Sequence, residues 1–160
     1  MKKLLLFTLL LLMGLNQSLV AQKLIRMPAF YKGYGVVFSD SVKIPFKLDS
    51  ISSQASLTMQ EVEEAESILN DQYNGFLDKL GVEQKYTKKL KFFYRQYFSF
   101  INLKGEKKVI VSLLYFKNKR RARRNFTGWD KEIFFGFGEF YEKNMRIYKV
   151  NLQKKKLEIF

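Results

Sequence analysis

Residues 58–81 have the sequence TMQEVEEAESILNDQYNGFLDKLG, which predicts one long amphipathic helix. Thr58 and Glu61 have the spacing of a capping box, in which each side chain bonds a backbone amide at the helix start. Gly81 stands where a left-handed residue commonly ends a helix, although Asn74-Gly75 is an alternative, earlier end. Apolar residues recur at three- and four-residue steps and form one stripe, namely Val62, Ala65, Leu69, Tyr73, Phe76 and Leu80. The acidic residues expected mostly off this stripe are Glu63, Glu64, Glu66, Asp71 and Asp78.

Downstream of this helix, two β-rich runs surround a turn. Residues 90–101 are dense in Phe and Tyr, and residues 107–116 are rich in Val, Ile and Leu. Residues 102–106 contain Asn and Gly between them, so the two runs predict an antiparallel hairpin. Aromatic residues would cover both faces of the first strand: Phe92, Phe93, Tyr94, Tyr97, Phe98 and Phe100. One face is expected to pack on the helix, while the other either meets a second layer or is exposed as a binding surface.

The remaining segments are predicted from shorter patterns. Residues 117–130 form a basic connection, and residues 132–141 an aromatic strand in which Gly136 and Gly138 indicate a bulge. Further strands are expected at 145–152 and 157–160. Before the helix, short strands are expected at 36–38 and 42–46, with Pro45 confining the second to an edge or an end. The Ser-rich residues 49–57 predict a linker.

These elements predict an α+β fold. One main helix would pack on a curved antiparallel sheet of about four strands, because a single apolar stripe needs one sheet face to cover it. The chain would then divide into a signal peptide (1–21), an N-terminal segment with short strands and a linker (22–57), and a helix-plus-sheet domain (58–160).

The first residues predict an export signal. Lys2 and Lys3 precede an apolar run from Leu4 to Leu15, and Ala21 is a small residue suited to cleavage before Gln22. The run has about a dozen residues, whereas a membrane-spanning helix needs about 20. We therefore expect no transmembrane span after processing and a periplasmic or secreted protein.

Charge is high and unevenly distributed. The formal net charge is +14, of which +12 remains if Lys2 and Lys3 leave with the signal. Residues 58–81 carry −5, while residues 82–160 carry +14. Such a balance favours encounter with anionic partners.

Composition also excludes several chemistries. The chain has no His and no Cys, which excludes Ser-His-Asp and Cys-His nucleophilic systems, His/Cys zinc sites and thiol redox chemistry. No phosphate-binding or dinucleotide-binding glycine motif is present, so no cofactor or metal is expected. A carboxylate-dependent hydrolase would have to use Glu132, Glu139 and Glu142. Solvated charges at a strand edge are the simpler interpretation of these three.

The densest basic run is at residues 117–124. Six of these eight residues are basic, and an aromatic residue, Trp129, follows. Guanidinium forks bind phosphate or carboxylate groups in pairs of hydrogen bonds, so the run is a candidate anion-binding or partner-binding site. A solvated loop is the simpler interpretation, because exposed charge runs are common. The candidate site residues are Lys117, Lys119, Arg120, Arg121, Arg123, Arg124 and Trp129.

Two segments resemble a known group of proteins over roughly residues 58–160. The segments are Tyr94–Tyr97 leading to Gly105 and to Val109–Val111, and Trp129 followed by Glu132–Tyr141 and Arg146–Leu152. The resemblance is to short exported proteins, largely uncharacterised, of Bacteroidota-type bacteria that have a cystatin-like fold. It implies that fold and export, and it implies no activity. The Gln-x-Val-x-Gly hairpin tip of cystatin protease inhibitors has no counterpart in residues 102–106, which makes protease inhibition a remote alternative.

The sequence therefore favours an exported, non-enzymatic binding module of the cell envelope. Its partner would be an envelope protein or an anionic envelope polymer, with no nucleic acid expected. The main alternative is a peripheral protein that binds anionic lipid or polysaccharide through residues 117–124. A carboxylate-dependent hydrolase is the less favoured third hypothesis.

Overall fold

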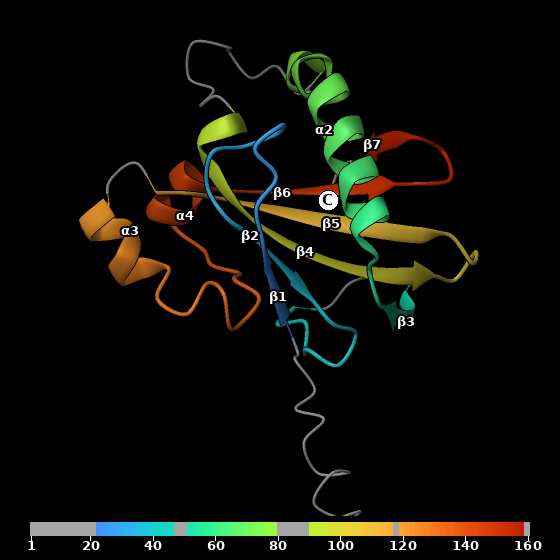
Figure 1. Cartoon of the computed structure of the whole chain (residues 1–160), viewed down its shortest axis with the longest axis horizontal. Coiled ribbons are helices and arrows are strands. Elements are labelled where there is room, and N and C mark those ends of the chain that lie inside the picture. The colour runs from blue at the N-terminus through green and yellow to red at the C-terminus, as the bar shows by residue number, and fades with distance from the viewer. Residues whose placement is uncertain (1–21, 47–50, 80–89, 117–118, 159–160) are drawn as a thin grey trace, which may run out of the picture.

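The computed structural model describes residues 22–46, 51–79, 90–116 and 119–158, which build a single mixed sheet of seven strands (Figure 1). The strands are β1 (Gln22–Ile25), β2 (Gly35–Phe38), β3 (Ile51–Ala55), β4 (Phe93–Asn102), β5 (Lys107–Tyr115), β6 (Met145–Asn151) and β7 (Lys156–Glu158). The helices are α2 (Met59–Lys79), the 3₁₀ turn η2 (Leu90–Phe92), α3 (Lys119–Asn125) and α4 (Glu139–Asn144). The predicted signal peptide lies outside the described residues.

The strand order is β1-β2-β4-β5-β6-β7, and β3 also pairs with β4. One edge of β4 is shared by two strands, because β2 pairs with Arg95–Tyr97 and β3 with Ser99–Asn102. The first of these pairings is parallel and the second antiparallel. Residues 22–57 thus contribute three strands to the same sheet as the rest of the chain.

The predicted fold class was wrong. The sheet has seven strands rather than about four, and it is mixed rather than antiparallel, because β2 runs parallel to β4. This pairing joins Gly35–Val37 to residues 60 positions later in the chain, and no local sequence pattern announces such a contact. The predicted hairpin is present as β4 and β5, which pair over their full length.

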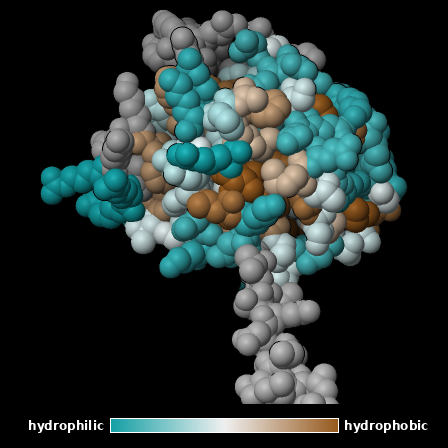
Figure 2. Space-filling model, in the orientation of Figure 1, coloured by the Kyte–Doolittle hydropathy of each residue, from teal (hydrophilic) through white to brown (hydrophobic). Residues whose placement is uncertain are grey.

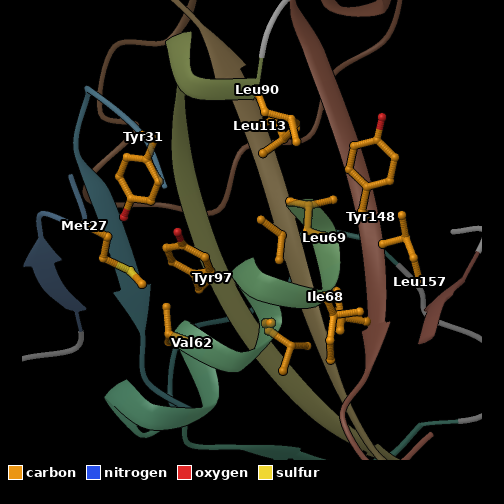
Figure 3. Close-up of a cluster of buried hydrophobic side chains, with 14 of the residues drawn as sticks. Met27, Tyr31, Val62, Ile68, Leu69, Leu90, Tyr97, Leu113, Tyr148 and Leu157 are labelled. Atoms are coloured by element: carbon orange, nitrogen blue, oxygen red, sulfur yellow. The ribbon is translucent and has the colours of Figure 1, made fainter. Parts of the chain in front are cut away.

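Helix α2 covers one face of the sheet. The backbone amide of Thr58 donates to Glu61 Oε2 at 2.9 Å, and the amide of Glu61 donates to Thr58 Oγ1 at 3.2 Å, so the capping box forms as the spacing predicts. Figure 3 shows the apolar side chains of α2 meeting those of the strands in one buried cluster. Its labelled members from α2 and the central strands are Val62, Ile68, Leu69, Tyr97, Leu113 and Tyr148.

The opposite face of the sheet is also covered. Phe98, Phe100 and Ile110 are buried there against Ile133 and side chains of the segment that precedes β3. Closer to α3 and α4, Phe126 packs with Leu114 and Met145 and is only 1% exposed. Phe98 and Phe100 of β4 therefore meet a second layer, whereas Phe92 in η2 is 46% exposed and Tyr94 is half-buried.

Four local predictions differ from the structure. Residues 51–55, inside the predicted linker, form β3 because β4 offers an edge beside them. Residues 42–46 form no strand, and residues 119–125 form α3 rather than a loop. Residues 132–138 form no strand either, because they cross the second face of the sheet instead of joining its edge.

Candidate functional site

A pocket of about 690 Å³ opens at the end of the sheet where β4 begins and β5 ends. Its lining comes from four separate parts of the chain: the loop between β1 and β2, η2, the facing ends of β4 and β5, and α3. In Figure 1 this is the end of the sheet near α3, opposite the turn that joins β4 to β5. The lining residues are Lys32, Gly33, Phe92, Tyr94, Tyr115, Phe116 and Arg123. A volume of this size is within the range of small-molecule sites, which span about 300–1,000 Å³.

Tyr94 forms a fixed wall of the pocket. Its ring stacks on Phe116 with the centroids 4.4 Å apart and meets the edge of Trp129 at 5.1 Å. A methyl group added at Gly33 would overlap the Tyr94 ring, so glycine is what allows the loop between β1 and β2 to approach this closely. With neighbours on several sides, the ring has little freedom to turn.

Two cationic side chains line the pocket with these aromatic groups. Lys32 comes from the loop between β1 and β2, and Arg123 from α3. The Lys32 Nζ lies 5.7 Å from the centroid of Phe92, and the Nζ of Lys91 lies 5.4 Å from the same ring. Phe92 is 46% exposed, which is high for a large apolar side chain. Within the described part of the chain, neither Lys32 nor Arg123 forms an ion pair with a carboxylate.

A buried ion pair supports the pocket from beneath. Arg95 and Glu66 have side chains that are 0% exposed, and Arg95 Nε donates to Glu66 Oε1 at 2.9 Å. Arg95 Nη1 donates to the carbonyl groups of Leu90 and Phe93 at 3.1 and 2.8 Å, so it binds the first residue of η2 and the residue that directly follows η2. Because Phe92 belongs to η2, the guanidinium of Arg95 determines where this pocket residue lies.

The same arginine also fixes the loop that carries Lys32. The guanidinium carbon of Arg95 lies 4.7 Å from the ring centroid of Tyr31, and the Lys32 amide donates to the carbonyl of Lys91 at 2.9 Å. On the other side, the Tyr97 hydroxyl donates to Glu66 Oε1 at 3.0 Å. Burial raises the pKa of Tyr97 well above its ordinary value, so this phenol stays protonated as a donor.

Gln96 holds the second layer against the sheet. Its fully buried side-chain amide donates to the carbonyl groups of Trp129 and Glu132, and its carbonyl oxygen accepts from the amide of Phe134 at 2.9 Å. These three hydrogen bonds tie residues 129–134 to β4. Trp129, which contacts the pocket wall, is therefore held in place by the strand that provides that wall.

The structure brings only one residue of the predicted basic site into the pocket. Arg123 lines the pocket, and the side chains of Arg120 and Arg124 are exposed on α3. Lys119 and Arg121 lie in α3 by their backbone, and Lys117 falls outside the described residues. Trp129 is half-buried behind Tyr94 and Phe116, with its ring 6.0 Å from Phe116. It acts as a support for the pocket wall and is not a free aromatic group beside the basic run.

The three carboxylates considered for hydrolysis are exposed. Glu132 and Glu142 lie at the surface, and Glu139 pairs with Lys143 on α4. None of them lines the pocket. The described residues also contain no group of three or more acidic side chains placed to hold a metal ion.

Sequence analysis named Arg123 in the basic run and Phe92 and Tyr94 on a possible aromatic binding face, and it missed the other lining residues. Lys32 and Gly33 lie in a segment without periodicity, and Phe116 and Tyr115 were expected only as the end of a strand. The one available signal was Gly33-Tyr34-Gly35, since closely spaced glycines are typical of tight backbone approach.

Comparison with known proteins adds no further candidate. No family model, curated protein or solved structure matches this chain. The resemblance to the cystatin-like group therefore stays a prediction.

Proposed function

We propose that this chain is an exported, non-enzymatic binding module of the cell envelope, and that its ligand site is the aromatic pocket between the loop of β1 and β2, η2 and α3. The ligand would carry an anionic group that lies between Lys32 and Arg123, with its less polar part against Phe92 and Phe116. The observation that supports this most is that two cations line the recess without a carboxylate partner among the described residues, and that the other described side chains of the lining are aromatic.

Physical chemistry favours an anion in this position. Hydrogen bonds from Lys or Arg to a carboxylate or phosphate are short and roughly twice as strong as neutral ones. Lys32 and Arg123 are both exposed, so water and salt partly screen such bonds, and the aromatic side chains beside them add apolar contact with the rest of the ligand. Because Tyr94 and η2 are held by the contacts described above, little conformational entropy would be lost when a ligand binds.

The proposal of a non-enzymatic role rests on the side chains present. The chain lacks His and Cys, and among the described residues the pocket lining contains no carboxylate that could act as a general acid or base. The proposal of export rests on the sequence of residues 1–21. Among the described residues, no helix combines the length and apolarity needed to cross a bilayer.

Trp129 provides a direct binding assay. It is the single tryptophan of the chain and contacts two pocket residues, so its fluorescence should change when the pocket is occupied. Galacturonate and inorganic phosphate serve as probes, titrated against the wild type, Lys32→Ala and Arg123→Ala. Removing either cation should weaken binding about tenfold, as expected for the loss of one charge-assisted hydrogen bond. Lys104→Ala, an exposed position in the turn between β4 and β5, is the matched control and should bind as the wild type does.

Two results would refute this function. One is the absence of any saturable change with either probe in the wild type. The other is equal affinity across all four proteins, which would place binding elsewhere on the surface. Export is tested separately by cell fractionation: the expected product begins at Gln22 and lies outside the cytoplasm, whereas an unprocessed chain in the cytosol would contradict the proposal.

A further inference from the structure

The charged side chains of the sheet are sorted between its two ends. At the end that carries the turn between β4 and β5, lysines are paired with carboxylates of α2 and the neighbouring strands. Lys107 Nζ lies 2.6 Å from Glu61 Oε1, and Lys108 Nζ lies 2.9 Å from Glu158 Oε1. The other pairs at this end are Lys108–Glu106, Lys149–Glu158, Lys154–Glu106 and Lys155–Glu64.

The pocket end has the opposite character. Lys32 and Arg123 in the pocket, together with Arg120 and Arg124 on α3, form no ion pair with any described carboxylate. Lys91 on η2 is exposed beside Phe92 and is likewise without a described acidic partner. At the turn end, Glu61 and Glu64 of α2, Glu106 of the turn and Glu158 of β7 are paired with lysines, whereas the cations beside the pocket have no described acidic partner.

Helix α3 extends this charge beyond the pocket. Arg120, Arg123 and Arg124 are spaced three and four residues apart, so they lie on one side of the helix as neighbours. Arg123 lines the pocket, and the other two are exposed next to it. Figure 2 shows hydrophilic side chains projecting from the side of the molecule where Figure 1 places α3.

We propose that the ligand is an acidic polysaccharide, of which one acidic sugar enters the pocket while adjacent acidic sugars lie along Arg120 and Arg124. This inference rests on the proposed function and names its ligand class. A single small anion would leave Arg120 and Arg124 without a partner, whereas a linear polyanion places successive charges along the helix and the pocket. Binding several linked groups raises the overall affinity without new contacts at the first site, because each later contact is intramolecular.

The shape of the region favours a polymer over a bilayer. Its binding groups lie partly in a recess, which a flat lipid surface would not enter. A bilayer-docking helix also presents apolar side chains outward between its cations. Here the described exposed side chains of α3 are arginines, and the aromatic residue that follows it, Phe126, is buried. The exposed Phe137 belongs neither to α3 nor to the described pocket lining.

A length series of galacturonate oligomers tests the ligand class. Galacturonate, its trimer and its hexamer are titrated against the wild type, the double variant Arg120→Ala/Arg124→Ala, and a control, Lys104→Ala/Lys131→Ala, whose side chains are exposed away from the pocket lining. We expect the hexamer to bind the wild type at least tenfold more tightly than the monomer, and this gain to be lost in the Arg120/Arg124 variant. Monomer binding should be the same in all three proteins.

Other results would overturn the polysaccharide inference, with or without the proposed function. If the hexamer binds no better than the monomer, or if the Arg120/Arg124 variant keeps the gain, the polysaccharide inference is overturned while the pocket remains a binding site. If no length binds, both this inference and the proposed function fail. Vesicles containing phosphatidylglycerol form a further arm, and binding to them through Arg120 and Arg124 without binding to the hexamer would replace the polymer with a membrane.

Discussion

Separating the buried ion pair between Glu66 and Arg95 should destabilise the protein strongly. Replacing Arg95 with Leu removes the 2.9 Å bond to Glu66 and the two bonds to the carbonyl groups of Leu90 and Phe93. It also leaves the Glu66 carboxylate inside the protein, fully buried and without its cation. Breaking a buried pair in this way costs about 3–5 kcal/mol, a large share of a total folding free energy that is typically about 5–15 kcal/mol.

The assay is urea unfolding followed by Trp129 fluorescence, applied to Glu66→Leu, Arg95→Leu and the double variant. For a chain of this size the slope of unfolding free energy on urea is about 2 kcal/mol per molar, so each single variant should lower the midpoint by roughly 2 M. The double variant should be less destabilised than the sum of the singles by about 2–3 kcal/mol, because no unpaired charge then remains buried.

The pair Glu61–Lys107 is the matched control. Its atoms approach to 2.6 Å, yet both side chains are more than a fifth exposed. Water screens such a pair, so its coupling energy should be at most about 1 kcal/mol. A coupling between Glu66 and Arg95 no larger than that of the control would refute the reasoning that burial makes this pair strong.

Three other changes follow from the same geometry. Gln96→Ala removes three hydrogen bonds to residues 129–134 and should lower the free energy of unfolding by about 2–4 kcal/mol. The fluorescence emission of Trp129 in the native protein should shift to the red. An unchanged spectrum would argue against the anchoring role of Gln96. Lysine and asparagine side chains hold the pKa of Glu106 down to about 2, so the stability that its carboxylate provides is complete above pH ~4.5 and is lost as pH falls toward 2. Glu106→Gln should therefore make the free energy of unfolding less dependent on pH between these values. An unaltered pH dependence would contradict this. Gly33→Ala should displace Tyr94, because the added methyl group would overlap its ring, and should weaken galacturonate binding about tenfold or more. Unimpaired binding would mean that Tyr94 is not a fixed wall.

The sequence predicts the local elements of this fold better than its assembly. Helix α2 and the hairpin of β4 and β5 follow from apolar spacing, a capping box and a turn, all of which are local signals. The parallel contact of β2 with β4 depends on residues far apart in the chain. Residues 132–138 are rich in aromatic groups and predict a strand, but Gln96 binds their backbone and turns them across the face of the sheet.

For the candidate site too, local sequence patterns are more informative than the contacts between distant segments. Glu66 was expected off the apolar stripe because it is acidic, yet it comes four residues after Val62 and three before Leu69, which places it on the buried side of α2. Helical spacing alone would have placed it there if residue type had been ignored. The basic run was found by composition, but only its Arg123 lines the pocket. The second cation, Lys32, could not be predicted, because its position depends on the path of a loop that has no periodic pattern.

The central claim is that Lys32 and Arg123 together bind one anionic group. A crystal structure of the protein with galacturonate trimer tests it most directly. We predict a carboxylate of the trimer within about 3.2 Å of both Lys32 Nζ and the Arg123 guanidinium, with its ring beside Phe92. A trimer bound at any other surface, with an empty pocket, would contradict the account.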